Sequence, residues 1–327
     1  MTPRPLFYRM AGLAALAYLA AEQAPHVRHV NFYGLHRIPA DRVLREIQLH
    51  PGDPLPGSRG ELEDRIAKIP GVFAARVEGV CCEGPEADLF IGIEERGGPH
   101  VALRSAPVGE AALPEELAEA YDGFVTAVKR AGTIRSSPET HAAEQQFTEF
   151  AEAHAGELRE VMRNSADVEQ RAIAAGILRF APRKQSAVDD LQYALQDPDE
   201  TVRENALGSL RVFALLSVKQ PRLNLRVEPT WLVELLNSVV LGDRMQSVDL
   251  LITLTDGGDP AVLEQVRSRA LPPLVEMARW ENLRYALPAF VLVGRLAGLS
   301  DEETQREWKR EAREPVIQRA LGRAPRR

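Results

Sequence analysis

Between residues 27 and 95, apolar and polar positions follow two different periods. They alternate in three segments, over residues 27–34, 73–78 and 89–95, and this pattern predicts strands. Between the first two segments, apolar positions recur three and four residues apart, which predicts helices over residues 39–48 and 58–68. Ser58 is the expected N-cap of the second helix. The predicted order is therefore strand, helix, helix, strand, strand.

The alternation also assigns the faces of the predicted sheet. Val30 and Phe32 are expected to face inward, and Asn31 and Tyr33 outward. In the last strand the inward residues are expected to be Leu89, Ile91 and Ile93, and the outward ones Phe90, Gly92 and Glu94. A sheet with one apolar face needs a cover, and the two predicted helices can supply it.

The first unit closes with an acidic residue, Glu95, at the end of its last strand. This order and this ending resemble the POTRA domain (polypeptide-transport-associated domain) of outer-membrane assembly factors and of a bacterial division protein. The resemblance covers residues 27–95 and implies a small α+β domain (β-α-α-β-β) that holds other polypeptides and performs no chemistry. The unit stands singly and no β-barrel follows it, so a barrel-assembly role is not expected.

A different pattern begins after a break. Residues 97–112 contain Gly97, Gly98, Pro99, Pro107 and Gly109, which predicts a linker. From residue 113 onward the sequence predicts helices and no strands, beginning with amphipathic helices over residues 113–131 and 138–163.

The second half contains a repeated motif. Its clearest copy is Asp197-Pro-Asp-Glu-Thr-Val202-Arg203-Glu-Asn-Ala206. An earlier copy contains Asp167 and Arg171, and the spacing between the two arginines is 203 − 171 = 32 residues. Weaker copies contain Arg244 and Arg284, at spacings of 244 − 203 = 41 and 284 − 244 = 40 residues. The motif resembles the inter-helix turn and second helix of a HEAT repeat. The resemblance to HEAT repeats covers residues 138–300.

The HEAT resemblance implies an all-α superhelical solenoid, in which stacked helix pairs bury a shared apolar face. It also implies that the motif's aspartate caps the second helix and that its arginine bridges to a neighbouring repeat. We therefore expect a multidomain chain. Its expected parts are a signal peptide or N-terminal anchor (1–24), a POTRA-like domain (26–96), a linker (97–112), a HEAT-like repeat domain (113–322) and a disordered basic tail (323–327).

The N-terminus indicates export. Arg4 and Arg9 precede an apolar run over residues 10–21, which is typical of a secretory signal peptide and is shorter than the roughly 20 residues of a membrane span. No clear cleavage site follows, so an uncleaved anchor and a buried helix remain open. The expected location is periplasmic or secreted, with inner-membrane anchoring toward the periplasm as the alternative. Contact with a membrane is expected only if the apolar segment is retained.

Charge and motifs exclude several functions. The net charge of −7 argues against nucleic-acid binding, which relies on a basic face. The adjacent Cys81 and Cys82 fall in a predicted turn, where they are either ordinary small residues, a redox pair or the site of an intermolecular bond. Four histidines, His26, His29, His36 and His50, have no metal-ligand spacing. No phosphate-binding loop, nucleophile elbow or dinucleotide fingerprint is present.

The sequence therefore predicts no enzyme and no catalytic, cofactor-binding or metal-binding residues. The expected function is a non-catalytic interaction or scaffold protein of the bacterial cell envelope. Its partner would be a protein or polypeptide, bound at the edge of the POTRA-like sheet and on the concave face of the HEAT-like repeats. The alternatives are a membrane-anchored division or assembly factor, and a HEAT-type lyase or lyase accessory.

Overall fold

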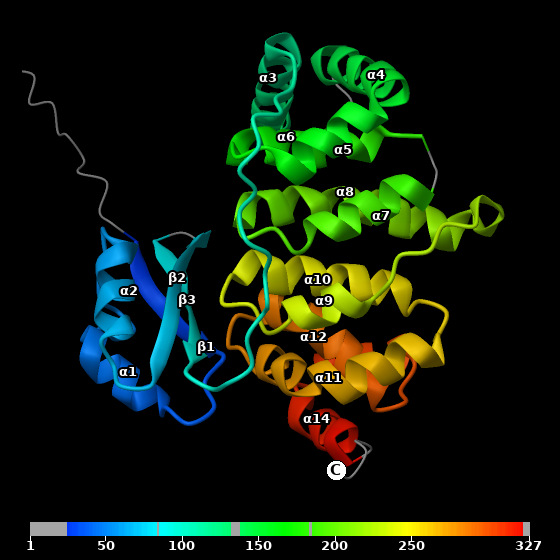
Figure 1. The fold of residues 1–327 in the computed structure, drawn as a ribbon. Helices are drawn as coiled ribbons and strands as arrows, with labels where there is room; N and C mark the ends of the chain where they lie inside the picture. Colours follow the sequence, from blue (N-terminus) through cyan, green and yellow to red (C-terminus); the bar gives the residue numbers. More distant parts are fainter. Residues whose placement is uncertain (1–24, 84, 132–137, 183–184, 323–327) are drawn as a thin grey trace, which may run out of the picture.

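A computed structural model describes residues 25–83, 85–131, 138–182 and 185–322 of the chain. Its N-terminal unit has the predicted order of elements: β1 (His26–Tyr33), α1 (Ala40–Ile47), α2 (Arg59–Ala67), β2 (Val72–Glu83) and β3 (Glu86–Glu95). The three strands form one sheet in the order β1-β3-β2, with β1 parallel and β2 antiparallel to β3 (Figure 1). Strands β1 and β2 are therefore the two edges.

Local chemistry explains where these elements begin and end. The Ser58 hydroxyl accepts a hydrogen bond from the Glu61 N–H, which makes it the N-cap of α2 as predicted. Gly34, which follows β1, has a φ of +80°, a conformation that residues with a β-carbon rarely adopt. Glu95 at the end of β3 accepts hydrogen bonds from the N–H groups of His36, Arg37 and Ile38, and so fixes the turn after β1.

The remainder of the described chain is helical, with two short 3₁₀ turns at residues 178–180 and 221–223. The predicted helix over residues 138–163 is two helices, because the chain breaks at His154. The helices are α3 (Glu115–Ala131), α4 (Pro138–Ala153), α5 (Ala155–Asn164), α6 (Val168–Ile177), α7 (Gln185–Ala194), α8 (Glu200–Lys219), α9 (Thr230–Leu235), α10 (Leu241–Leu254), α11 (Pro260–Ala278), α12 (Leu283–Leu296), α13 (Asp301–Lys309) and α14 (Arg313–Gly322). Among the described residues, no helix is long and apolar enough to cross a membrane.

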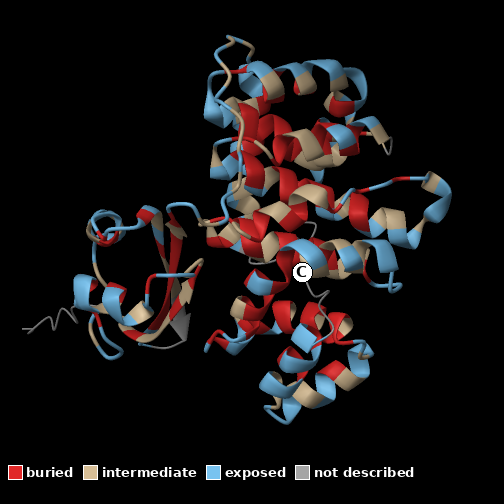
Figure 2. Cartoon of the chain, turned by 60° about the horizontal axis from the view of Figure 1, so that its bottom comes forward, coloured by how far each residue is buried: buried red, intermediate tan, exposed pale blue. Residues whose placement is uncertain are grey.

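These helices form a repeating stack. Helices α6, α8, α10 and α12 pack against one another in one row, and α5, α7, α9 and α11 pair with them in a second row. Figure 1 shows the pairs as successive layers, and Figure 2 shows that buried residues run through all of them. A single apolar cluster extends from Leu117 in α3 to Ile317 in α14. The structure is thus a helical repeat stack with a small three-stranded sheet at its N-terminal side.

Buried ion pairs join successive repeats. Arg171 donates to Asp197, Arg203 donates to Asp243, and Arg244 donates to Glu276 at 3.2 Å. Each arginine also donates to a backbone carbonyl six residues earlier in the chain, at Ser165, Asp197 and Ser238 respectively. The predicted bridge from Arg203 to a neighbouring repeat is therefore confirmed.

Two details of the predicted motif are wrong. Asp197 does not cap α8; the N-cap is Asp199, whose carboxylate accepts from the N–H groups of Thr201 and Val202. Asp197 accepts from Arg171 of the preceding repeat instead. Arg284 does not continue the series, because it is exposed at the start of α12. The series of ion pairs between repeats, which we call the buried ladder, therefore ends with the pair Arg244–Glu276 of α10 and α11.

The predicted linker has no helix, but it is held along the stack. Arg104 N–H donates to the Gln196 carbonyl, and the Arg104 guanidinium lies 3.1 Å from the centre of the Tyr193 ring. Further along, Gly109 exchanges backbone hydrogen bonds with Asn164 and Ala166. Burial lowers the pKa of Arg104 to about 10. Figure 1 shows this segment running beside the helices from the sheet to α3.

The sheet is covered on both faces. On one face Leu89, Ile91 and Ile93 pack with α1 and α2 in a cluster of their own, with Val30 and Phe32 against it, as predicted. Val27 belongs to the same cluster. The expectation for the other face is wrong: Tyr33 and Phe90, assigned outward, are fully buried in the apolar cluster of the helical stack. The Phe90 ring lies 5.0 Å from both Trp280 and Tyr285. Alternation gave the correct side for each residue, but the outward side meets helices and not solvent.

Candidate binding groove

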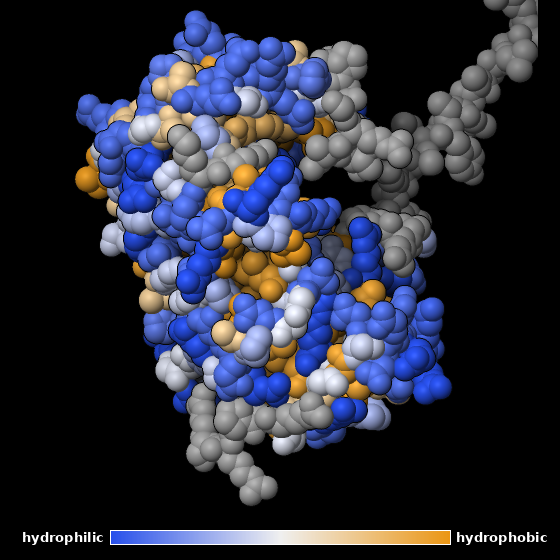
Figure 3. Space-filling view, turned by 90° about the vertical axis from the view of Figure 1, so that its right-hand side faces the viewer, coloured by the Kyte–Doolittle hydropathy of each residue, from blue (hydrophilic) through white to orange (hydrophobic). Residues whose placement is uncertain are grey.

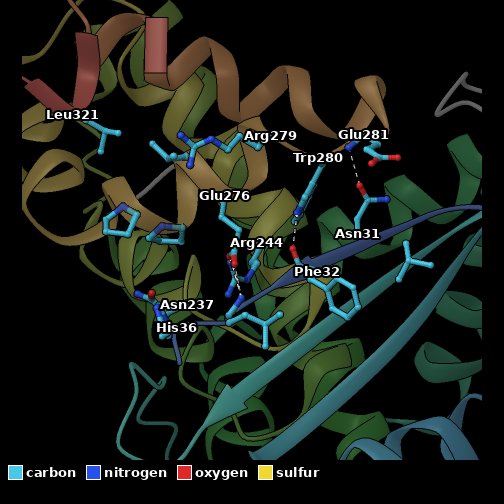
Figure 4. Close-up of a pocket in the computed structure, with 16 residues that line it drawn as sticks. Asn31, Phe32, His36, Asn237, Arg244, Glu276, Arg279, Trp280, Glu281 and Leu321 are labelled. Atoms are coloured by element: carbon cyan, nitrogen blue, oxygen red, sulfur yellow. Dashed lines mark hydrogen bonds and ion pairs between the residues drawn. The ribbon is translucent and has the colours of Figure 1, made fainter. Parts of the chain in front are cut away.

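A hollow lies where the sheet meets the stack. It is a groove of about 580 Å³ between the β1 edge and helices α11 and α14 (Figure 4). One wall is a run of strand and turn residues from Val30 to His36. The opposite wall comes from Pro272, Pro273, Trp280 and Leu321. A sheet edge thus faces a largely apolar helical wall, more than 200 residues away in the chain.

Two contacts show which backbone groups of β1 point into this groove. The Trp280 indole Nε1–H donates to the Phe32 carbonyl at 3.1 Å, and the Gly34 N–H donates to both carboxylate oxygens of Glu276, at 2.9 and 3.0 Å. Backbone groups of alternate strand residues point the same way. Val30, Phe32 and Gly34 therefore direct their N–H and C=O groups away from β3 and toward the groove.

The two ends of this edge are already occupied. At the start of β1, the Val27 N–H donates to the Asp53 carbonyl and the Gly52 N–H donates to the Val27 carbonyl. At its end, the Phe32 carbonyl accepts from Trp280 and the Gly34 N–H donates to Glu276. Between them lie the Val30 N–H, the Val30 C=O and the Phe32 N–H. Among the described residues, no hydrogen bond from outside the sheet reaches these three groups. We call them the β1 window.

An unsatisfied amide lies beside the window. Asn31 is only 3% exposed, and its Oδ1 accepts a hydrogen bond from the Glu281 N–H at 2.9 Å. This contact fixes the orientation of the amide, so the other terminal atom is the nitrogen. That Nδ2 is buried and has no acceptor among the described residues. Most buried polar groups in proteins are paired, so a lone donor at the wall of a groove marks a place for an acceptor.

Both arginines of the groove are paired with a carboxylate. Arg244 lies beneath the Tyr33 ring, 4.6 Å from its centre, and donates to Glu276. Arg279 donates to Glu314 at 2.7 Å. Burial raises the pKa of Glu276, an effect that Arg244 and the Gly34 N–H oppose. Glu281 also lines the groove, and its exposed carboxylate lies 3.6 Å from His29. Elsewhere the groove offers backbone groups and apolar side chains.

The other edge of the sheet differs. The Val77 N–H of β2 donates to Glu63 of α2 at 2.8 Å, so the middle of this edge is occupied. Arg76 beside it lies 3.7 Å from Glu63 and 3.6 Å from Glu200 of the stack. A second hollow of about 540 Å³ lies here and is lined by charged residues. The β2 edge is therefore crossed by side chains that already bond to one another.

The residues considered from sequence do not form a catalytic or metal site in the described structure. His29 contacts the buried Asp88, which also accepts from Arg28 and Asn282, so this cluster fastens the sheet to α12. His36 lines the groove. No group of three or more potential metal ligands occurs among the described residues.

Cys81 and Cys82 lie in β2 rather than in the turn after it. Their side chains fall outside the described residues, as does the leader, residues 1–24. The sequence pattern did not single out Glu276, Trp280 or the β1 window. Asn31, a polar residue between the apolar Val30 and Phe32, carried a sequence signal for this site.

A further hollow, lined by polar and apolar residues, lies between α4 and α8. It measures about 550 Å³, and Phe180 and Val212 are among its lining residues. On α8 the exposed apolar residues are Leu215 and Val218. Figure 3 shows apolar side chains gathered in a depression on one side of the molecule, between charged rims.

Comparisons with known proteins leave the family open. No protein-family model and no curated protein matches the sequence. Among solved structures, the chain is similar to a designed armadillo repeat protein, with 15% identity over 64% of this chain and all of that chain, at a TM-score of 0.37. It is also similar to computationally designed armadillo repeat proteins for modular peptide recognition, with 14% identity over 64% of this chain and all of that chain, at a TM-score of 0.36. These scores are too low to carry an argument, so the helical repeat stack rests on the packing described above.

Proposed function

We propose that this protein is a non-catalytic scaffold of the bacterial cell envelope that binds polypeptide partners. The observation that carries the proposal is the β1 window: an open stretch of sheet edge inside a groove walled by the helical stack. Strand edges bind polypeptides through backbone hydrogen bonds, and helical repeat stacks bind proteins along extended surfaces. The exposed apolar residues Leu215 and Val218 of α8 mark a second surface.

The first unit is proposed to be a POTRA-like domain. Its order of elements and its acidic residue Glu95 agree with what that resemblance implies. The protein is proposed to be periplasmic or secreted, or to be held at the inner membrane by an uncleaved N-terminal anchor. This proposal rests on the basic and apolar character of residues 1–21. Mass spectrometry of the mature N-terminus separates these forms, because cleavage removes the apolar run and an anchor keeps it.

Site-specific photo-crosslinking in the native host tests the scaffold function. A photoreactive amino acid is placed at one of three positions: Leu35 in the groove, Leu215 on α8, or Val108 in the segment 97–112. The Val108 side chain is 91% exposed. We expect a polypeptide to be crosslinked from Leu35 or Leu215 and not from Val108. Crosslinks from Val108 alone, or from none of the three, would contradict the proposal.

The absence of turnover is tested separately. The variant Cys81→Ser/Cys82→Ser removes every thiol of the chain, because the sequence has two cysteines. We expect it to crosslink the same partner with the same yield and to support the same cellular phenotype as the wild type. A variant that still crosslinks the partner but loses the phenotype would favour the lyase alternative.

A further inference from the structure

The two covered faces restrict where a partner can reach the sheet. One face packs on α1 and α2, and the other on Trp280 and Tyr285 of the stack. Only the two edges remain. Since Glu63 already accepts from the Val77 N–H, the β2 edge is occupied at its centre. The β1 window lacks such a contact over residues 30–32 and faces the groove, so its backbone groups are the ones that we consider for a partner.

The length of the window limits what it can hold. It offers two N–H groups and one C=O group over residues 30–32, and both of its ends are closed by the contacts of Val27 and Gly34. An extended chain presents its own N–H and C=O groups with the same two-residue repeat. A pairing of two or three residues therefore fits, and a long added strand does not.

The groove also indicates the character of the occupant. Its wall opposite β1 is apolar at Pro272, Pro273 and Leu321, while Arg244 and Arg279 are each paired with a carboxylate. Apart from the Glu281 carboxylate at its end, the described part of the groove offers no acidic or arginine side chain without a charged partner, whereas an apolar side chain would displace water from apolar surface. The buried Asn31 Nδ2 lacks only an acceptor, which a peptide carbonyl supplies.

We infer that the β1 window binds a short, extended and uncharged segment of a partner polypeptide, whose backbone pairs with Val30 and Phe32 and which supplies a carbonyl acceptor to Asn31. This inference rests on the proposed function and deepens it, because it names the edge, the length and the chemistry of the bound segment. The affinity comes mainly from backbone groups, so many sequences of low charge fit.

The test uses the full chain and a defined probe. The probe is an acetylated, amidated heptapeptide of alternating valine and threonine carrying a neutral fluorophore, and binding is followed by fluorescence anisotropy. The control probe is methylated on every backbone nitrogen and cannot donate backbone hydrogen bonds. We expect the first peptide to bind and the second to lose binding. Equal binding of the two peptides, or binding of neither, overturns the inference.

Matched proline variants decide which edge is used. Val30→Pro removes an N–H from the window, and Ala75→Pro removes the corresponding outward N–H from β2, two residues before Val77. Proline is tolerated at edge positions whose N–H faces away from the sheet. We expect Val30→Pro to weaken binding about tenfold, as for the loss of one backbone hydrogen bond, and Ala75→Pro to leave it unchanged. The reverse pattern, or no loss with Val30→Pro, overturns the inference.

A second measurement covers the case in which Val30→Pro does not fold. Hydrogen exchange of the Val30 and Phe32 amides is followed by NMR in the wild type with and without the peptide. Added peptide should slow both exchange rates at least tenfold, and unchanged rates contradict the window. Asn31→Asp keeps the acceptor for the Glu281 N–H but removes the amide donor, and it should weaken binding as well.

The crosslinking experiment separates this inference from the proposed function. If Val30→Pro still crosslinks the native partner from Leu35 or Leu215 with full yield, the scaffold function stands and the window is wrong. If the peptide binds as expected but no partner is crosslinked in the host, the window stands and the scaffold function is wrong.

Discussion

Individual arginines hold the repeats together from inside. Arg203 is 2% exposed and makes hydrogen bonds to the Asp243 carboxylate and to the carbonyls of Asp197 and Pro198. A buried ion pair is not necessarily more stable than an apolar replacement of both partners, but removing one partner leaves a charge without compensation. These residues therefore fix the register between repeats.

Arg203→Ala is expected to destabilise the protein by about 3–5 kcal/mol, because Asp243 would remain buried without its cation. Chemical denaturation followed by circular dichroism measures this free energy of unfolding. The control is Arg159→Ala, whose side chain is 42% exposed and whose partner Asp190 keeps Arg163. We expect it to cost less than about 1 kcal/mol. Similar losses for both variants would contradict a special role for the buried ladder.

Glu95 makes the first unit sensitive to acid. Burial would raise its pKa, but the backbone N–H groups of Ile38, His36 and Arg37 outweigh burial and lower the pKa. A carboxyl group with a lowered native pKa stabilises the fold above its unfolded pKa of about 4.3, and this contribution is lost as the pH falls through the native value.

Glu95→Gln is therefore expected to cost about 1.5–3 kcal/mol at neutral pH, since hydrogen bonds to a charged group are lost. The difference from the wild type should shrink below about pH 4. Denaturation at a series of pH values measures it. Glu94→Gln is the matched control: burial raises the pKa of Glu94, so this change should not destabilise the protein at neutral pH. A Glu95→Gln difference that is constant with pH would refute the assignment.

Among the elements, β3 comes close to the stack just before the start of α10. Gly92 of β3 has no side chain, and a β-carbon there would overlap the Tyr33 ring and the Val239 carbonyl oxygen. The Tyr33 hydroxyl donates to that same carbonyl at 2.8 Å, and Glu78 of β2 accepts from the Leu241 N–H at 3.0 Å. The packing of the sheet on the stack thus depends on glycine at position 92 as well as on hydrogen bonds.

Gly92→Ala is expected to loosen this docking at a cost of about 1–3 kcal/mol, because the packed surroundings cannot absorb the added atom. Faster hydrogen exchange at the Leu241 amide and faster proteolysis within residues 97–112 would report it. Gly60→Ala in α2 is the control, since nothing lies within 4 Å of the added β-carbon. Unchanged exchange and proteolysis in Gly92→Ala would show that the docking tolerates the added atom.

In the described part of the chain, two apolar clusters meet at one interface. The buried members of the stack's cluster that come from the sheet are Tyr33 and Phe90, with Val80 packed against them, whereas the second cluster lies within residues 27–93. The stack therefore has most of its core without the first unit. Docking adds aromatic contacts such as Phe90 with Trp280, and such pairs contribute about 0.5–1.5 kcal/mol each beyond the area that they bury.

Deletion of residues 27–95 is expected to leave a helical protein that unfolds cooperatively at a lower temperature than the full chain. The loss of stability follows because Trp280 and Tyr285 become exposed and Glu276 loses the Gly34 N–H. Thermal unfolding followed by far-ultraviolet circular dichroism measures both properties. A gradual, non-cooperative transition would mean that the stack needs the sheet as part of its core.

Local patterns in the chain were enough to predict the order of the elements in the first unit, the N-cap at Ser58 and the bridge from Arg203 to the next repeat. Each depends on residues near in sequence or on a repeated motif. The break at His154 and the cap at Asp199 were missed, because competing caps and turns differ little in local energy.

The groove was decided by contacts between residues far apart in the chain. Alternation placed Tyr33 and Phe90 on one side of the sheet, but only the folded stack shows that this side is buried against Trp280. The β1 window is likewise defined by Glu276 and Trp280, more than 240 residues from the strand. A backbone edge carries no side-chain signature, so its openness depends on which distant groups reach it and which do not.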